Sequence, residues 1–539
     1  MKHLKGIPVS KGISLGFAVV YLKRKIEVNN SKDSVPIEEK KKILEKALEK
    51  TKEEIQLTYE NLKKSNPKEA EIFEAHLLVL EDPTLQEKIN KYLESQYNLP
   101  YAVKSAFEEF IEALQNLQSE YMKERAQDLY DILDSLLRNI LNVPKVDLSN
   151  LPPQSVVVAE DLTPSDTASL DRKNVLGFIT ERGGPTSHTA ILAEALGIPA
   201  IVGVEELFES IHDGDELIID GTNGDVFVNP TEETKKQYTN LKKEKEEEEK
   251  LLKEKAKEFA YTKGGKRIEV AANIGSPKDV DKALEMGAEG VGLYRTEFLF
   301  LDRDTPPTEE EQFEAYKIVA ERFKPHPVII RTLDIGGDKQ IPYLNLEKEL
   351  NPFLGVRAIR LCLKEKDLFK TQLRAILRAS AFGNVLIMYP MIAIKDEIIE
   401  ANKVLNEVKE DLRRENIPFN ENIKVGIMVE IPSAALNAEE LVDYVDFFSI
   451  GTNDLTQYTY ASDRTNENLS YLYRPLDSPI LKLIKFTVDA SHMKGKWTGV
   501  CGELAGDPEA IPILVNLGVD ELSMSPSKIP EAKRIIRSI

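Results

Sequence analysis

The sequence is poor in cysteine and has no long hydrophobic run. Cys362 and Cys501 are the two cysteines among 539 residues, so a disulfide framework is excluded. No stretch approaches the roughly 20 apolar residues of a membrane span, and no apolar segment follows the charged N-terminus as it would in a secretory signal. We therefore expect a cytoplasmic protein without membrane insertion.

Positive charge is also in deficit. Lys and Arg number 71 against 91 Asp and Glu, which gives a formal net charge of -20. Nucleic-acid-binding proteins need basic surfaces, so we expect no nucleic-acid partner. The apolar share of 42% and the charged share of 30% exclude a collagen-like or wholly disordered chain. The length predicts three or four domains.

The first half of the chain divides into an α/β domain and a helical block. Between residues 147 and 230, short apolar runs bounded by Gly, Pro or Asp alternate with helical segments. Residues 1–23 contain a similar β segment, which we expect to join that domain. Residues 24–146 are predicted to be almost entirely helical, so this block would be an insertion within a discontinuous domain.

A charge run and a β-then-α rhythm mark the second half. Residues 231–261 are rich in Lys and Glu, which predicts a solvated linker helix, with a partner-binding tail as the alternative. Residues 262–539 alternate strands with amphipathic segments. We expect strands at 268–274, 290–294, 327–332, 385–390, 425–429, 446–450 and 497–500, and a less clear one near 354–358. Eight strands predict a (β/α)8 barrel. An open doubly wound sheet is the competitor, but no glycine-rich fingerprint follows the first strand.

Polar or reactive side chains follow five of the expected barrel strands. They are Arg295, Arg331, Glu430, Asn453 with Asp454, and Cys501. The carboxyl ends of barrel strands face one mouth, so we expect these residues to share a site. Arginines suit phosphate and carboxylate oxygens, and Arg464 follows closely in sequence. Each arginine taken alone fits a surface ion pair as well.

The residue types at these strand ends indicate the ligand. Glu430 and Asp454 are carboxylates on successive strands, which suits Mg²⁺. The site is therefore predicted to bind a small, multiply anionic metabolite that chelates Mg²⁺. For Cys501, the roles of acid, nucleophile and buried filler all stay open.

A second signal lies in the α/β domain. The expected strand 175–179 leads into Gly183-Gly184-Pro185-Thr186-Ser187-His188, and a helix is expected to begin near Thr186 or Ser187. A helix N-terminus disfavours an imidazolium, so His188 should stay neutral and nucleophilic. Free N–H groups and the neighbouring hydroxyls could stabilise an added phosphoryl group. A capping or packed histidine is the alternative.

These motifs are similar to those of Enzyme I of the bacterial phosphotransferase system. The likeness spans nearly the whole chain, and its main motifs are Gly183–His188, Gly292–Glu297, Arg331–Lys339, Glu430–Pro432, Gly451–Leu455 and Cys501–Gly506. The histidine and barrel motifs also occur in pyruvate phosphate dikinase and phosphoenolpyruvate synthase. The helical insertion and the lack of a large ATP-binding domain favour Enzyme I.

The resemblance implies a role for each matched residue. His188 would be the phosphorylated nucleophile, and Cys501 would protonate the enolate to give pyruvate. Phosphoenolpyruvate would be held by Arg295, Arg331, Asn453, Asp454 and Arg464, with Lys339 and Arg357 bordering the pocket. Glu430 and Asp454 would bind Mg²⁺.

The resemblance also implies the partners. The helical block would dock the phosphocarrier protein HPr, and the barrel would form a homodimer. Because His188 would serve both phosphoenolpyruvate and HPr, hinges are expected near residues 143–153 and 229–264. The competing hypotheses are a dikinase-like enzyme and a catalytically silent, HPr-binding regulatory paralogue; the intact set of site residues argues against the second.

Two features at the ends of the sequence refine the resemblance. No sensory domain precedes Gly6, which favours the sugar-uptake branch, in which the enzyme catalyses the first step. The family usually carries a helical tail beyond the position of Ile539. None of the matched site residues would lie in that tail.

Overall fold

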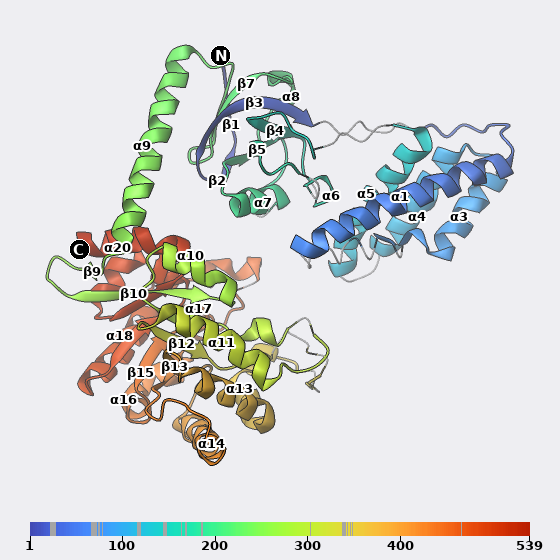
Figure 1. Ribbon diagram of the computed structural model, residues 1–539. Helices are drawn as coiled ribbons and strands as arrows, with labels where there is room; N and C mark the ends of the chain where they lie inside the picture. Colours follow the sequence, from blue (N-terminus) through green and yellow to red (C-terminus); the bar gives the residue numbers. More distant parts are fainter. Residues whose placement is uncertain are drawn as a thin grey trace. The chain divides into compact units, whose positions relative to one another are not determined.

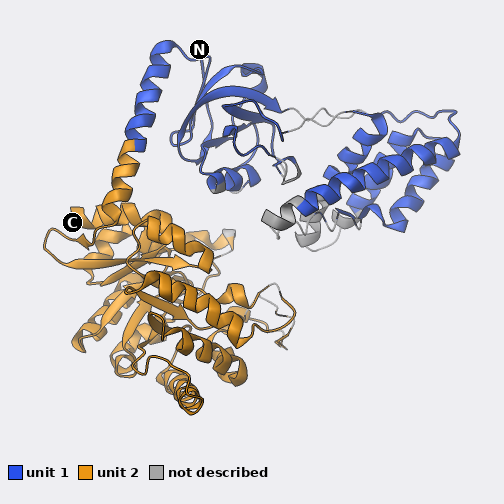
Figure 2. Ribbon diagram, in the orientation of Figure 1, with its two compact units in different colours: residues 1–246 blue, residues 247–539 orange. Residues whose placement is uncertain are grey.

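A computed structural model describes residues 1–21, 28–65, 73, 76–77, 79–115, 120–143, 148–162, 164–167, 170–184, 187–301, 303–336, 341, 343–344, 346–347, 349–464 and 466–539. The chain forms two compact units, Met1–Glu246 and Glu247–Ile539, whose boundary falls inside helix α9 (Glu232–Ala256) (Figure 2). Within the described residues, every helix is too short or too polar to span a bilayer.

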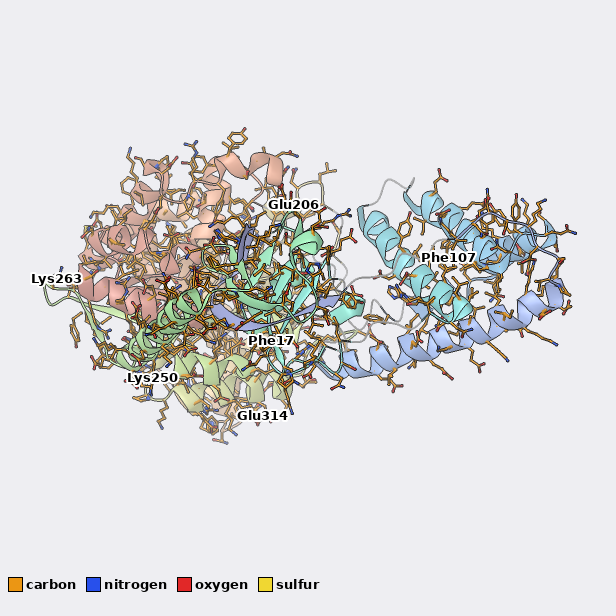
Figure 3. All side chains as sticks on the ribbon, turned by 90° about the horizontal axis from the view of Figure 1, so that it is seen from above. Phe17, Phe107, Glu206, Lys250, Lys263 and Glu314 are labelled. Atoms are coloured by element: carbon orange, nitrogen blue, oxygen red, sulfur yellow. The ribbon has the colours of Figure 1, made fainter. Side chains whose placement is uncertain are left out.

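The helical block is a bundle with its own apolar core. Its helices are α1 (Ile37–Ser65), α3 (Pro83–Glu94), α4 (Leu99–Gln115) and α5 (Glu120–Leu141). Leu44, Thr51 and Ile55 lie on the buried stripe of α1. Phe107 of α4 is fully buried among these helices (Figure 3). Asp82 caps α3 by accepting a hydrogen bond from the Thr84 amide at 2.7 Å.

A mixed eight-stranded sheet forms the α/β part of the first unit. Its spatial order is β1 (Lys2–Lys5), β8 (Asp225–Val228), β7 (Glu216–Asp220), β3 (Ile13–Tyr21), β4 (Ser155–Ala159), β5 (Val175–Thr180), β6 (Ala200–Val202) and β2 (Ile7–Ser10). Strand β3 pairs in parallel with β4, in the register Ala18 to Val156. The N-terminal strands β1 to β3 therefore belong to the same sheet as β4 to β8, although the helical block separates the two groups in sequence. Helices α6 (Pro164–Thr167), α7 (His188–Leu196) and α8 (Leu207–Ser210) follow β4, β5 and β6.

The second unit is a closed barrel of eight parallel strands (Figure 1). They are β10 (Arg267–Ile274), β11 (Val291–Tyr294), β12 (Pro327–Arg331), β13 (Asn384–Tyr389), β14 (Val425–Val429), β15 (Phe447–Ile450), β16 (Trp497–Val500) and β17 (Glu521–Met524). Pairing of β10 with both β11 and β17 closes the barrel, and β9 (Ala260–Tyr261) adds to β10 in antiparallel fashion. The predicted fold class, a (β/α)8 barrel with a small α/β domain and an inserted helical bundle, is confirmed.

Helices on the outside of the barrel cover its strands. They are α10 (Val280–Glu285), α11 (Glu309–Phe323), α12 (Ile359–Lys364), α13 (Lys366–Ala379), α14 (Lys395–Arg414), α15 (Pro432–Leu436), α16 (Ala438–Leu441), α17 (Thr452–Tyr460), α18 (Ser478–Met493), α19 (Ala510–Asn516) and α20 (Ile529–Ser538).

The expected strand near 354–358 is wrong, and β17 takes its place. A short 3-10 turn covers Pro352–Leu354, and Ala358 has a positive φ of 52°, which breaks an extended strand. In β17, Leu522 and Met524 pack in the apolar core, while Glu521 and Ser523 face the barrel interior near Gly292. A four-residue strand with two polar residues facing inward gives little apolar signal in the sequence.

Candidate active site

A cavity of about 730 Å³ opens at the carboxyl ends of the barrel strands. The structure brings all of the site residues predicted for the barrel into its lining. The lining comprises Leu293, Arg295, Glu297, Arg331, Asp334, Gly336, Phe353, Arg357, Met428, Glu430, Gly451, Asn453, Asp454, Gln457, Arg464, Tyr473, Cys501, Gly502 and Glu503. Lys339, expected beside the pocket, lies outside the described residues.

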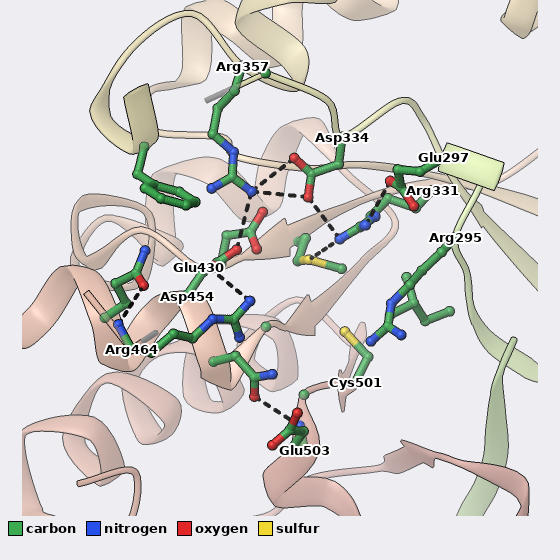
Figure 4. A pocket seen from close by; sticks show the side chains of 18 of the residues that line it. Arg295, Glu297, Arg331, Asp334, Arg357, Glu430, Asp454, Arg464, Cys501 and Glu503 are labelled. Atoms are coloured by element: carbon green, nitrogen blue, oxygen red, sulfur yellow. Dashed lines mark hydrogen bonds and ion pairs between the residues drawn. The ribbon is translucent and has the colours of Figure 1, made fainter. Parts of the chain in front are cut away.

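Asp334 holds two arginines of this pocket together (Figure 4). Its carboxylate lies 3.1 Å from Nη1 of Arg331 and 3.0 Å from Nη2 of Arg357. Arg331 also pairs with Glu297 at 2.8 Å. Burial alone would lower the pKa of Arg331. The negative charges of Glu297, Asp334 and Glu430 outweigh this effect and raise the pKa above its ordinary value, so the guanidinium is charged. The network fixes two cationic forks on one wall of the pocket.

Arg295 stands apart from this network. It has no ion-pair partner among the residues that the structure describes, and Figure 4 shows its guanidinium beside the Cys501 thiol. Burial and the nearby charge of Arg331 lower the pKa of Arg295. Arg464 is held only loosely, since its Nη2 lies 3.9 Å from Oδ1 of Asp454. These two cations are available to an anionic ligand.

Glu430 and Asp454 place two carboxylates at adjacent strand ends. Oε1 of Glu430 accepts a hydrogen bond from the Met391 amide at 2.7 Å. Oε2 faces Gly451, where a Cβ would lie 3.0 Å away. Burial first, and then the charges of Asp454 and Asp334, raise the pKa of Glu430 well above its usual range. A cation between Glu430 and Asp454 would relieve this repulsion, so the pair fits Mg²⁺.

The donor set limits how Mg²⁺ could be held. No group of three or more His, Cys, Asp or Glu side chains suited to a metal occurs in the part of the chain that the structure describes. Mg²⁺ is commonly bound through one or two carboxylates, with water and substrate phosphate completing its octahedron. Glu430 and Asp454, which lie in the same pocket as Arg295 and Arg464, therefore fit a metal whose coordination shell is completed by the bound substrate.

Cys501 follows β16 and lines the pocket with its thiol, which is 1% exposed. Sγ lies 3.6 Å from the Ile450 carbonyl oxygen, to which it donates. Burial raises the pKa of Cys501 to about 11, although the nearby Ser449 side chain lowers it in part. At neutral pH the thiol is therefore protonated, which suits an acid better than a nucleophile.

Several pocket residues escaped the sequence reasoning. Glu297 and Asp334 come two and three positions after the arginines of their strands, and an acidic residue at that offset was the available signal. Gln457 accepts a hydrogen bond from the Arg464 amide at 3.1 Å and fixes its loop. The Glu503 amide donates to Oδ1 of Asn453 at 3.0 Å, which orients that amide side chain.

His188 is the first residue of α7, and Ser187 caps this helix by accepting from the Ala190 amide at 3.3 Å. The helix thus begins where the sequence predicts. The imidazole ring of His188 is half-buried, and its Nε2 lies 2.8 Å from Oγ1 of Thr167. No sequence pattern predicted Thr167 as a partner. Pro185 and Thr186 of the motif lie outside the described residues. The arrangement places the imidazole at a helix N-terminus, as the sequence predicts.

Comparison with protein families assigns three segments to one group of enzymes. Residues 248–539 match the PEP-utilising enzyme, PEP-binding domain. Residues 151–224 match the PEP-utilising enzyme, mobile domain, and residues 5–125 match the PEP-utilising enzyme, N-terminal. The pocket belongs to the first segment and His188 to the second.

Curated relatives align over the full chain. The phosphoenolpyruvate-protein phosphotransferase of Priestia megaterium is 49% identical over 100% of this chain and 94% of its own. That of Bacillus subtilis (strain 168) is 47% identical over 100% of this chain and 95% of its own. An NMR solution structure of Enzyme I is 42% identical, with a TM-score of 0.42, over 45% of this chain and 99% of its own.

Proposed function

Because the chain belongs to the phosphoenolpyruvate-protein phosphotransferase family, we propose that it transfers the phosphoryl group of phosphoenolpyruvate through His188 to HPr, releasing pyruvate. This is the first step of the sugar phosphotransferase system. The observation that carries the proposal is the barrel-mouth pocket. It combines Arg295, which has no ion-pair partner among the described residues, the neighbouring carboxylates Glu430 and Asp454, and the Cys501 thiol, which is protonated at neutral pH.

Phosphoenolpyruvate carries a phosphate and a carboxylate, and the pocket offers cations for both. Arg295 and Arg464 are available to ligand oxygens, and Arg331 presents the rest of its fork from the Asp334 network. The oriented amide of Asn453 can donate to a further oxygen. Asp454 would join the substrate site through the metal. Phosphoryl transfer depends mainly on such positioning and on stabilising charge.

Mg²⁺ is part of the proposal, held by Glu430 and Asp454. When bound, it would supply charge that stabilises the phosphoryl oxygens. The raised pKa of Glu430 supports this role, since burial and neighbouring carboxylates leave that group short of positive charge. Arg357 reaches Asp454 at 3.5 Å and would keep its carboxylate in place.

In the proposed reaction, His188 accepts the phosphoryl group and Cys501 supplies the proton. A nitrogen of His188 forms a bond to phosphorus while the bond from phosphorus to the enol oxygen breaks. The resulting enolate takes a proton on its terminal carbon from Sγ of Cys501, which gives pyruvate and a thiolate. The Thr167 hydroxyl holds the imidazole ring in one orientation. Phosphohistidine then passes the phosphoryl group to HPr.

The assignments of domains and partners follow from the family resemblance. We propose that residues 24–146 dock HPr, that 1–23 and 147–230 carry the phosphohistidine, and that 231–261 link them to a barrel domain of 262–539. The barrel would form a homodimer, and the reaction would take place in the cytoplasm. His188 and the pocket belong to different compact units, and we propose that hinges near residues 143–153 and 229–264 let the histidine serve both partners.

Labelled phosphoenolpyruvate tests the proposal directly. With Mg²⁺, the wild-type protein should acquire acid-labile, base-stable label and pass it to purified HPr. His188→Ala should acquire none, whereas the matched control His212→Ala, whose side chain is 78% exposed, should label fully. Unlabelled wild type would support the silent paralogue, and label that requires ATP would support a dikinase-like enzyme.

A further inference from the structure

A second cavity, of about 270 Å³, lies at the opposite end of the barrel from the active-site pocket. Most of its lining stands at or beside the first residues of strands, and the lining comprises Glu269, Pro327, Asn384, Leu386, Lys424, Trp497, Asp520 and Glu521. The reaction described above uses none of these residues. The cavity is a separate feature of the second unit.

The cavity contains a buried carboxylate without a counter-charge. Glu521 is 3% exposed, and its Oε1 has no hydrogen-bond partner among the described residues. Glu269, its register neighbour across β10 and β17, likewise has an unpartnered Oε1. A buried ionised carboxylate is costly unless a cation or hydrogen bonds satisfy it. Burial raises the pKa of Glu521 well above its usual range and that of Glu269 to about 7, although the charge of Arg267 lowers the pKa of Glu269 in part.

The barrel makes room for the Glu521 carboxylate. A Cβ at Gly499 would lie 2.7 Å from Oε1 of Glu521, and a Cβ at Gly292 would lie 2.8 Å from it. These contacts are too close for a real side chain, so both neighbouring positions have to be glycine for the carboxylate to lie where it does.

Nearby cations and carboxylates are already paired elsewhere. Glu289 pairs with Arg267 at 2.9 Å and with Lys533 at 2.8 Å. Asp520 accepts hydrogen bonds from the Thr498 amide at 2.9 Å and from the His492 ring at 2.8 Å. Lys424 is exposed at the rim and forms no ion pair with a described residue. Glu521 and Glu269 are thus the carboxylates left for a ligand.

The rest of the lining selects the kind of cation. Trp497 stacks on Phe447 at 4.6 Å, so the part of its ring that lines the cavity is the opposite face or the edge. Leu386 and Pro327 add apolar surface. Carboxylates attract an ammonium ion, and aromatic and apolar walls suit its alkyl stem.

We propose that this cavity binds a small organic ammonium ion, with Glu521 and Glu269 as its anionic partners and Trp497 as its aromatic wall. The site is independent of the proposed phosphoryl transfer. It gives the barrel a ligand site at each end, one for an anion and one for a cation.

The only tryptophan of the chain reports on this site. Titrating the full chain with n-butylammonium chloride should change the fluorescence of Trp497 saturably, whereas sodium chloride at equal ionic strength and n-butanol should not. Glu521→Gln should weaken binding roughly ten-fold, because a charge-assisted hydrogen bond is lost. The control Glu400→Gln, which removes an exposed carboxylate of α14, should bind as the wild type does.

Further variants keep the test decisive. If circular dichroism shows that Glu521→Gln does not fold, Glu269→Gln replaces it, with a several-fold loss expected. Lys424→Met should tighten binding, because it removes a positive charge from the rim. The absence of a saturable response, an equal response to sodium chloride, saturation by MgCl2 alone, or unweakened binding in the folded glutamine variant would each overturn the proposal.

Discussion

The barrel-mouth pocket and the N-terminus of α7, which carries His188 and is called here the histidine element, differ in how their side chains are held. The pocket fixes its charged groups against one another: Asp334 joins Arg331 to Arg357, and Glu297 holds Arg331 from the other side. His188 stands half-buried at the start of a helix, with the Thr167 hydroxyl against its ring. A binding pocket gains from rigid positioning, whereas a carrier has to present the same atom to two partners.

Removing the thiol should break the pocket's chemistry most severely. Cys501→Ser should lower the rate of pyruvate formation by about 10²- to 10⁴-fold, because it removes the proposed general acid. The KM for phosphoenolpyruvate should change little, since the neutral thiol does not pair with substrate charge. Steady-state pyruvate release measures both. Cys362→Ala, which removes the other buried thiol, should keep kcat near the wild-type value.

The pH dependence of the two directions should differ. Burial raises the pKa of Cys501 to about 11, so the thiol that donates the proton is fully present at neutral pH and forward turnover should not depend on its titration there. The reverse direction needs the thiolate, whose population rises about ten-fold per pH unit below that pKa. Deuterium incorporation into the methyl group of pyruvate, followed by NMR, should rise accordingly. A plateau near neutral pH would contradict the assignment.

Removing the carboxylate that joins Arg331 to Arg357 should weaken the binding of phosphoenolpyruvate more than it slows the reaction step. Asp334→Asn removes the carboxylate between Arg331 and Arg357, and we expect the KM for phosphoenolpyruvate to rise about ten-fold with a smaller change in kcat. The control Asp281→Asn breaks an exposed pair with Arg322 and should leave KM unchanged. A fall in kcat at unaltered KM would show that the network acts on the reaction step instead.

The smallest effect is expected at the histidine element. Thr167→Val keeps the shape of the side chain but removes the hydroxyl that orients His188, so phosphohistidine formation should slow by roughly five-fold. Rapid-quench labelling measures this step, and Thr371→Val, at a half-buried position of α13 whose hydroxyl donates to a backbone carbonyl, is the control. An effect as large as that of Asp334→Asn would contradict the contrast between the histidine element and the ion-paired pocket.

Sequence patterns anticipated much of the architecture and most of the pocket. Apolar runs located seven barrel strands, and the polar or reactive residues that follow five of them line one cavity because parallel strands end at the same mouth. The pattern failed at β17, where Glu521 and Ser523 interrupt the apolar signal. Asp334 and Thr167 were missed because their roles depend on contacts across the fold, which local spacing does not encode.

By itself, the sequence determined the order of elements, the helix that begins at His188, and the set of reactive side chains at the strand ends, since each follows from neighbours along the chain. Only the tertiary structure decided which charges are matched. At the mouth, Arg331 and Arg357 meet Asp334, whereas at the other end Glu269 and Glu521 are register neighbours that form no ion pair with a described residue. Burial and pairing depend on neighbours in three dimensions. The same chemical group, a carboxylate, therefore positions arginines at Asp334 but is left without an ion pair at Glu521.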